Sequence, residues 1–162
     1  MNKYQDHVLV LPEDDANRQI ATGFILNSNV INERAIQVLP IANGWGKVVD
    51  NFQDNHVSEM RRLPQRMMVL MIDFDEDYDN RFKYVKDRIP DDLENRVFVI
   101  GVLSEPEKLR SDIRKSFENI GEALANDCSN NNTNGLWGHD LLKHNKMELD
   151  RMILFVKPFL FN

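Results

Sequence analysis

The chain is poor in several features that would assign a sequence to a specialised class. Its 162 residues include one cysteine, Cys128, so no internal disulfide can form and a disulfide-stabilised secreted scaffold is excluded. No apolar run approaches the roughly 20 residues that a membrane-crossing helix requires. The first residues lack the apolar core of a secretory signal. We therefore expect a cytoplasmic protein with no membrane partner.

Positive charge is also scarce. Lysine and arginine number 20 against 26 aspartates and glutamates, which gives a formal net charge of −6. This balance argues against broad, salt-sensitive binding of a polyanion, because clustered lysines and arginines carry such binding. Nucleic acid remains an open partner, because a bound metal ion can supply positive charge locally in an acidic protein.

What is present suffices for one folded domain. Hydrophobic residues make up 42% and charged residues 28% of the chain, as in folded proteins rather than disordered ones. No internal repeat and no boundary divides the sequence. We expect a single domain over 1–162, with a core at about 7–105 and a C-terminal extension of helix and strand at about 106–162.

Four short apolar runs, rich in β-branched residues, predict buried strands. Segments with apolar residues three or four positions apart separate these runs and predict amphipathic helices. The predicted strands are 7–11, 35–41, 67–72 and 96–103. The predicted helices are 15–26, 47–62 (with an interruption), 80–89, 106–124 and 136–151, with a polar loop at 126–135 and a strand or packed tail at 152–157.

Alternation of strands and helices implies an α/β fold, with a mainly parallel sheet and helices on both faces. In such sheets, ligands bind beyond the carboxyl ends of the strands. The predicted strand ends carry Glu13, a glycine-containing loop at 43–47 and an aspartate run that begins at Asp73. We therefore expect the functional site at this edge.

Acidic residues at these ends suggest a divalent metal. Asp73 and Asp75 are two positions apart, so their carboxylates share one side if the strand geometry continues past Ile72. Glu13 joins them if the first and third strands are neighbours. Mg²⁺ prefers oxygen ligands and keeps several waters, and close carboxylates repel unless a cation or a proton neutralises them. Aspartate-rich turns after strands also occur without metal, as caps and turns.

The glycine loop is the second candidate. Gly44 and Gly46 could let main-chain N–H groups approach a phosphate, with Lys47 adding positive charge. The alternative is that these glycines only turn the chain and that Lys47 is solvated.

The order of these motifs resembles the Toprim domain of topoisomerases, bacterial primases and OLD-family nucleases, over residues 7–105. Glu13 is similar to the family's acid after the first strand, Asp73 and Asp75 to its Asp-x-Asp pair, and 44–47 to the glycine-plus-lysine turn of small stand-alone Toprim-like proteins.

The resemblance implies a Rossmann-like fold with a Mg²⁺ or Mn²⁺ site for phosphoryl transfer, most simply nuclease-type hydrolysis of phosphodiesters in a nucleic acid or nucleotide. Asp73 and Asp75 would hold the ion, and Glu13 would be a ligand or general acid/base, with Lys47 as a further catalytic candidate. Asp14 and Asn17 depart from the family's usual glycine and acidic residue.

Three alternatives stay open. The chain could be a non-catalytic Toprim-like partner or regulatory module. It could also be a receiver-like signalling domain, with Asp73 as phosphoacceptor and Lys157 as the lysine, although the gap between them is longer than receivers have. The apolar tail at 152–161 suggests a homodimer through the C-terminal segment, because an exposed apolar edge invites pairing.

Overall fold

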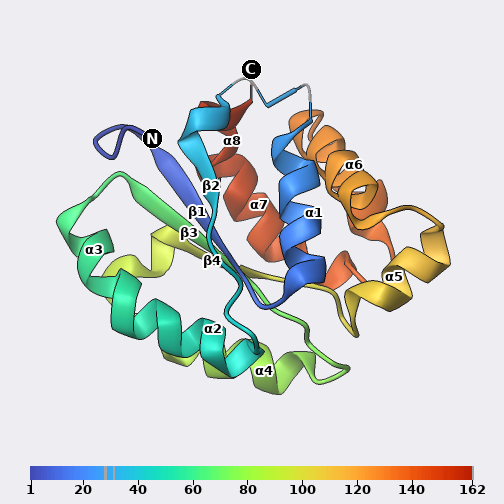
Figure 1. Ribbon diagram of the computed structural model, residues 1–162, viewed down its shortest axis with the longest axis horizontal. Helices are drawn as coiled ribbons and strands as arrows, with labels where there is room; N and C mark the ends of the chain where they lie inside the picture. The colour runs from blue at the N-terminus through green and yellow to red at the C-terminus, as the bar shows by residue number, and fades with distance from the viewer. Residues whose placement is uncertain (28, 31, 162) are drawn as a thin grey trace.

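The computed structural model describes residues 1–27, 29–30 and 32–161 and shows an α/β fold built on a four-stranded parallel sheet (Figure 1). The strands are β1 (His7–Pro12), β2 (Ile36–Val38), β3 (Arg66–Met71) and β4 (Val97–Ile100), in the order β2-β1-β3-β4. This arrangement confirms the predicted parallel sheet and is Rossmann-like.

The central strands explain why the sequence shows continuous apolar runs. β1 and β3 are paired along their whole length, from His7 opposite Arg66 to Pro12 opposite Met71. Every residue of β1 is buried, because helices cover both faces of the sheet. The edge strand β2 is shorter than predicted. It ends at Val38, two residues before Pro40, which has no N–H to donate to a ladder.

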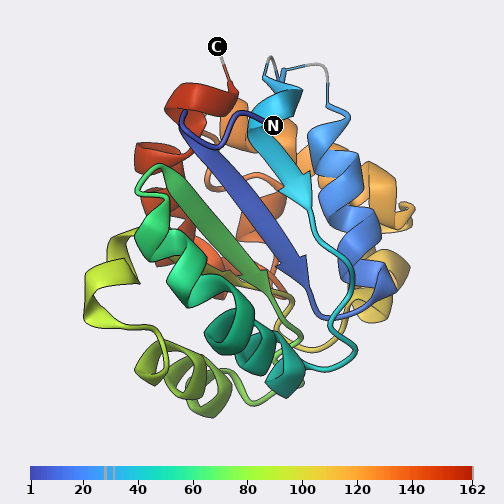
Figure 2. The same cartoon turned by 60° about the vertical axis from the view of Figure 1, so that its left-hand side comes forward.

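Helices form a layer on each side of the sheet (Figure 2). One layer contains α2 (Trp45–Asn51), a π-helical turn (Phe52–His56), α3 (Val57–Arg62), α4 (Tyr78–Asp87) and the 3₁₀ segment Asp91–Arg96. The π turn is the interruption expected within 47–62. The opposite layer contains α1 (Asp15–Ile25), α5 (Pro106–Ile113), α6 (Phe117–Ser129), α7 (Lys146–Phe155) and α8 (Lys157–Leu160), with 3₁₀ segments at Glu33–Ala35, Leu136–Gly138 and Lys143–Asn145.

Helices α1 and α6 pack unusually closely because each contributes a glycine to their contact. A Cβ atom on Gly23 would lie 2.0 Å from the carbonyl oxygen of Glu118, and one on Gly121 would lie 1.9 Å from that of Ile20. Any side chain at either glycine would force the two backbones apart. This contact fixes α1, whose first turn follows the functional edge of the sheet.

The sequence predictions after residue 106 are wrong in part. The expected helix 136–151 begins only at Lys146, after two 3₁₀ segments, and continues to Phe155. The expected helix 106–124 breaks at Arg114, which is left-handed with φ 55°, and restarts after Ser116, whose hydroxyl accepts from the N–H of Asn119. The polar segment 126–135 begins as the last turn of α6 rather than as a loop.

For 152–157 the sequence left a strand or a packed tail open; the strand is wrong, because the segment is packed and is helical as far as Phe155. The buried residues Leu149, Met152 and Val156 lie three or four positions apart, which is the spacing of one face of a helix. This face packs against the core, so the apolar run is buried without forming a strand. The described part of the C-terminal extension therefore consists of helices joined by turns, and its β-structure is limited to the bridge between Val30 and Phe161.

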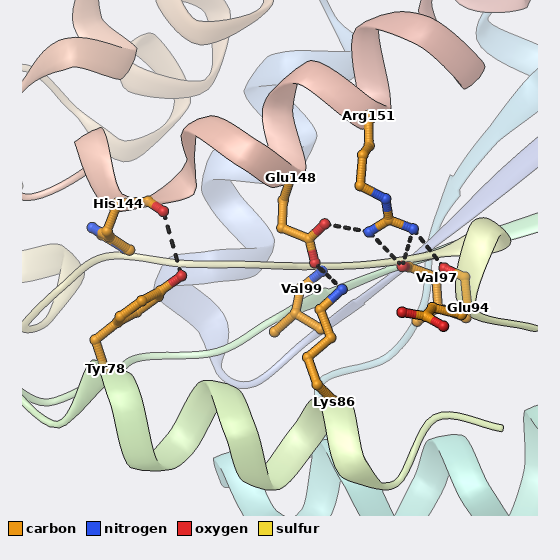
Figure 3. Close-up of polar contacts among 8 residues, drawn as sticks. All are labelled: Tyr78, Lys86, Glu94, Val97, Val99, His144, Glu148 and Arg151. Carbon is orange, nitrogen blue, oxygen red and sulfur yellow. Dashed lines mark hydrogen bonds and ion pairs between the residues drawn. The ribbon is translucent and has the colours of Figure 1, made fainter. Parts of the chain in front are cut away.

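Side chains of α7, rather than another strand, cover the outer edge of β4 (Figure 3). The carboxylate of Glu148 is 3% exposed and accepts a 3.2 Å hydrogen bond from the N–H of Val99. It also pairs with Lys86 at 2.5 Å and with Arg151. The guanidinium of Arg151 donates to the carbonyl of Val97 at 3.3 Å. The buried carboxylate of Glu148 is thus neutralised by two cations while it accepts a hydrogen bond from the outer edge of β4.

The same coverage continues just past β4. The side-chain amide of Asn145 accepts from the N–H of Gly101 at 3.1 Å and donates to its carbonyl at 3.0 Å. The Nε2 of His144 donates to the same carbonyl at 2.7 Å. The main-chain groups on this outer edge belong to Val97, Val99 and Gly101. Side chains of α7 and the turn before it form the hydrogen bonds that a neighbouring strand would otherwise provide.

Within the described ranges, no helix combines the length and apolar character that crossing a bilayer demands.

Candidate functional site

The carboxyl ends of β1 and β3 bring Glu13 and Asp73 together. The N–H of Glu13 continues the ladder by donating to the carbonyl of Met71 at 2.9 Å. The N–H of Asp73 then donates a 2.6 Å hydrogen bond to Oε2 of Glu13, a residue 60 positions away in the sequence. Both residues predicted from the strand ends therefore lie at one point of the sheet edge.

Two further residues complete this cluster. Asp14 is the N-cap of α1, and its Oδ1 accepts from both the N–H and the side-chain amide of Asn17, each at 3.0 Å. The same amide donates to Oδ1 of Asp73 at 2.9 Å. Asn17 is fully buried, so it ties the start of α1 to the end of β3. The two positions that depart from the Toprim pattern are thus both part of the site.

The cluster concentrates negative charge. Burial raises the pKa of Asp73 to about 8; the charges of Glu13 and Asp14 add to that rise, and the hydrogen bond from Asn17 opposes it. Burial also raises the pKa of Glu13, against the hydrogen bond from the N–H of Asp73. In the absence of a bound cation, a proton at Asp73 relieves the repulsion at neutral pH. Carboxylates with raised pKa values occur at functional sites, which makes this pair the candidate site.

Asp75 lies apart from this pair. Strand β3 ends at Met71, and Asp75 and Glu76 are left-handed, with φ 49° and 62°. The N–H of Asp75 donates to the carbonyl of Ser104, while its side chain is 73% exposed. The strand geometry therefore does not continue far enough to place Asp75 beside Asp73, and its role as a metal ligand stays a prediction.

Arg81 links the end of β3 to the exposed Asp75 and to the glycine loop at Trp45. The sequence alone did not identify this residue. It donates to the main-chain carbonyl of Asp73 at 2.7 Å, and its guanidinium lies 3.5 Å from the carboxylate of Asp75. It also lies 4.7 Å from the ring centroid of Trp45. In the sequence, Arg81 looks like an ordinary charged residue of the helix α4. It lies near the end of β3 only because the turn at 73–77 directs the chain back.

The glycine loop lies beside Glu13, as expected for loops after neighbouring strands. The N–H of Asn43 donates to the carbonyl of Glu13 at 2.8 Å, and that of Gly44 at 3.4 Å. Gly44 has φ 147°, a conformation that favours glycine, so it is needed for the turn into α2. Lys47 is exposed, and the space around Gly46 is open. The loop is close to the carboxylates, while phosphate binding by Gly44, Gly46 and Lys47 stays a prediction.

Fit to a metal ion can be judged from the donors. Among residues 1–27, 29–30 and 32–161, no three histidine, cysteine, aspartate or glutamate side chains converge as a metal site. Glu13, Asp14 and Asp73 nevertheless supply hard oxygen donors, and the pKa of Asp73 is raised first by burial and then by the charges of Glu13 and Asp14. Mg²⁺ and Mn²⁺ accept one or two protein carboxylates and fill their other positions with water or substrate, so this donor set fits.

Comparison of the chain with protein-family models, with curated proteins and with solved structures finds no match. The resemblance to Toprim domains therefore depends on the residues described above.

Proposed function

We propose that this chain binds one Mg²⁺ or Mn²⁺ ion at the ends of β1 and β3 and performs Toprim-like phosphoryl transfer, with hydrolysis of a phosphodiester as the reaction. The observation that supports this most is the meeting of Glu13 and Asp73 across two neighbouring strands, where burial and neighbouring carboxylates raise the pKa of Asp73. Asn17 replaces the acidic residue of the family pattern, which favours a single ion.

Each residue then has a defined task. A bound divalent ion supplies Lewis acidity and lowers the pKa of a coordinated water. Glu13 and Asp73 would hold the ion, with Asp75 as a further candidate ligand. Glu13, whose pKa is raised by burial, is also the candidate general acid/base. Lys47 and Arg81 provide the positive charge that a phosphate requires.

Aromatic and cationic side chains beside the site favour a nucleic acid or nucleotide as substrate. Trp45 and Tyr84 pack edge to face with centroids 5.2 Å apart. Arg81 lies over Trp45, and Arg88 lies over Tyr84 at 3.3 Å. Bases stack on such rings and guanidinium planes, and arginines also contact phosphates. This partner needs no broad basic surface, in keeping with the net charge of −6.

A cleavage assay tests the proposal. Single-stranded and double-stranded DNA and RNA are incubated with the wild type, Asp73→Asn and Asp79→Asn, each with MnCl₂, MgCl₂ or EDTA. Asp79 is exposed on the same segment and serves as the matched control. We expect cleavage by the wild type and Asp79→Asn in Mn²⁺, and a loss of at least about 100-fold in Asp73→Asn. Equal background cleavage by all three proteins would reject the enzyme.

A non-catalytic Toprim-like module is the second candidate, and one observation favours it. The site can neutralise itself without an ion, since Arg81 pairs with Asp75 and a proton can occupy Asp73. In that case Mn²⁺ binding would be weak or absent and no substrate would be cleaved, whereas binding of nucleic acid or a protein partner could persist.

The remaining alternatives have less support. Lys157, the lysine of the receiver interpretation, lies in α8 and donates to Oδ1 of Asn131 rather than to Asp73. A homodimer through the C-terminal segment now depends on Leu154 and Phe155, exposed apolar residues at the end of α7, since Met152 and Val156 are buried within the chain. A cytoplasmic location stays part of the proposal.

A further inference from the structure

An apolar cavity lies between the sheet and the helical layer formed by α1, α6, α7 and α8, on the opposite side of the sheet from α2 and α4. It offers about 60 Å³ to the centres of water molecules. A single water needs roughly 10–15 Å³ on this measure, so the cavity has room for several heavy atoms. Interiors of natural proteins contain few voids of this size. Its walls include Val10, Ala21, Phe24, Met71 and Trp137.

The walls determine what could occupy the cavity. They are apolar side chains almost throughout, so the body of a ligand must be apolar as well, because a polar group would lose its hydrogen bonds with water there. Among the lining residues in the described part of the chain, Lys157 alone is charged. It is partly exposed, and its ammonium donates to the neutral amide oxygen of Asn131 at 2.6 Å. A carboxylate would be a stronger acceptor for this ammonium.

We propose that this cavity binds the hydrocarbon chain of a small amphiphilic carboxylic acid, with about four to eight carbons inside and the carboxylate paired with Lys157 at the rim. The ligand class follows from an apolar interior with one cation at its boundary. This site is separate from the carboxylate cluster of Glu13 and Asp73 and does not depend on phosphoryl transfer.

The chain carries two reporters within the cavity wall. Trp137 is 5% exposed and is one of only two tryptophans, so Trp45→Phe leaves it as the sole tryptophan, which can be excited selectively at wavelengths that tyrosine hardly absorbs. Cys128 also lines the cavity, is 4% exposed and is the only thiol. Binding in the cavity must therefore change Trp137 emission and protect Cys128 from a maleimide reagent, and a ligand bound elsewhere on the surface would do neither.

The test titrates Trp45→Phe with hexanoate and with hexan-1-ol as the uncharged analogue. We expect saturable changes in Trp137 emission and about tenfold slower labelling of Cys128 at ten times Kd. Lys157→Met should weaken hexanoate about fivefold and leave hexan-1-ol unchanged, while the matched control Lys146→Met, on the exposed side of α7, should alter neither.

A second variant tests the location. Ala21→Leu extends a side chain into the space and should abolish binding of both compounds, with circular dichroism to confirm that the variant is folded. No response of Trp137 and Cys128 to either compound would overturn the proposal. Unchanged hexanoate affinity in Lys157→Met would overturn the assignment of the carboxylate to that residue.

Discussion

The N–H of Asp73 donates a 2.6 Å hydrogen bond to the carboxylate of Glu13. Because this donor belongs to the main chain at the end of β3, the orientation of the Glu13 side chain is set by the sheet itself and not by another flexible side chain. The hydrogen bond also lowers the pKa of Glu13 against the larger effect of burial. Changes at Asp73 should therefore preserve the position of Glu13 as long as the backbone stays in place.

The stability of the ion-free protein should decline as pH rises from about 4 to 8 through the effect of Asp73. Its pKa is raised to about 8, against about 3.9 in an unfolded chain. The folded state keeps a proton across this window that the unfolded state has lost, so the free energy of unfolding falls with rising pH and levels off above about pH 8. Asp73→Asn removes this contribution.

The measurement is urea unfolding in EDTA at several pH values, with the difference between Asp73→Asn and the wild type plotted against pH. That difference should grow in favour of the variant and exceed about 1 kcal/mol at pH 8. Asp79→Asn controls for the loss of an exposed charge. A difference that does not change with pH would show that Asp73 titrates normally.

Mn²⁺ should stabilise the wild type and leave Asp73→Asn almost unchanged. An ion that binds only the folded state adds about 2.7 kcal/mol to the free energy of unfolding at 100 times its Kd. Thermal melts in MnCl₂ and in EDTA measure this effect, with CaCl₂ and NaCl at matched ionic strength as comparisons. An equal rise in the melting temperature of both proteins would place the ion elsewhere on the chain.

Gly121→Ala should destabilise the protein by at least about 2 kcal/mol. The new methyl group would lie 1.9 Å from the carbonyl oxygen of Ile20, and a backbone atom cannot yield as a flexible side chain can. Gly138→Ala is the matched control, because a Cβ at that position meets nothing within 4 Å. Its free energy of unfolding should stay within about 0.5 kcal/mol of the wild type in denaturant titrations.

Glu148→Gln should cost about 3 kcal/mol of stability, because it leaves Lys86 and Arg151 facing a neutral group in a mostly buried place. Glu122→Gln, on an exposed position of α6, should change the free energy of unfolding little. Urea unfolding followed by circular dichroism compares the two. If both variants had the same free energy of unfolding, the ion pairs of Glu148 with Lys86 and Arg151 would contribute little to stability.

The sheet was predictable from the sequence because burial on both faces produces unbroken apolar runs such as 67–72. Its parallel order followed from helices between the runs. The helical C-terminal segment was not predictable in this way. Met152 to Val156 form an apolar run of strand length, and only the neighbouring helical turn with Leu149 shows that the burial has a helical period.

The site was predictable in part. Glu13 and Asp73 stand directly after recognisable strands, and the rule that ligands bind at the carboxyl ends points to them. The sequence did not identify Asn17 and Arg81 as members of the site, because both contact Asp73 only in the folded chain. Asn17 reaches Asp73 across the start of α1, and Arg81 returns to it from α4. Neither side chain differs in sequence from an ordinary polar residue on a helix.

The coverage of β4 by Asn145, Glu148 and Arg151 has a consequence for assembly. Outward main-chain groups of Val97, Val99 and Gly101 are already engaged, so an incoming peptide would find few donors or acceptors on that flank. Association by strand addition at β4 would first require α7 to detach, which would separate the buried carboxylate of Glu148 from its partners. The alternative is the opposite flank of the sheet, at β2. The β4 flank of the sheet is therefore closed to an added strand as long as α7 stays in place.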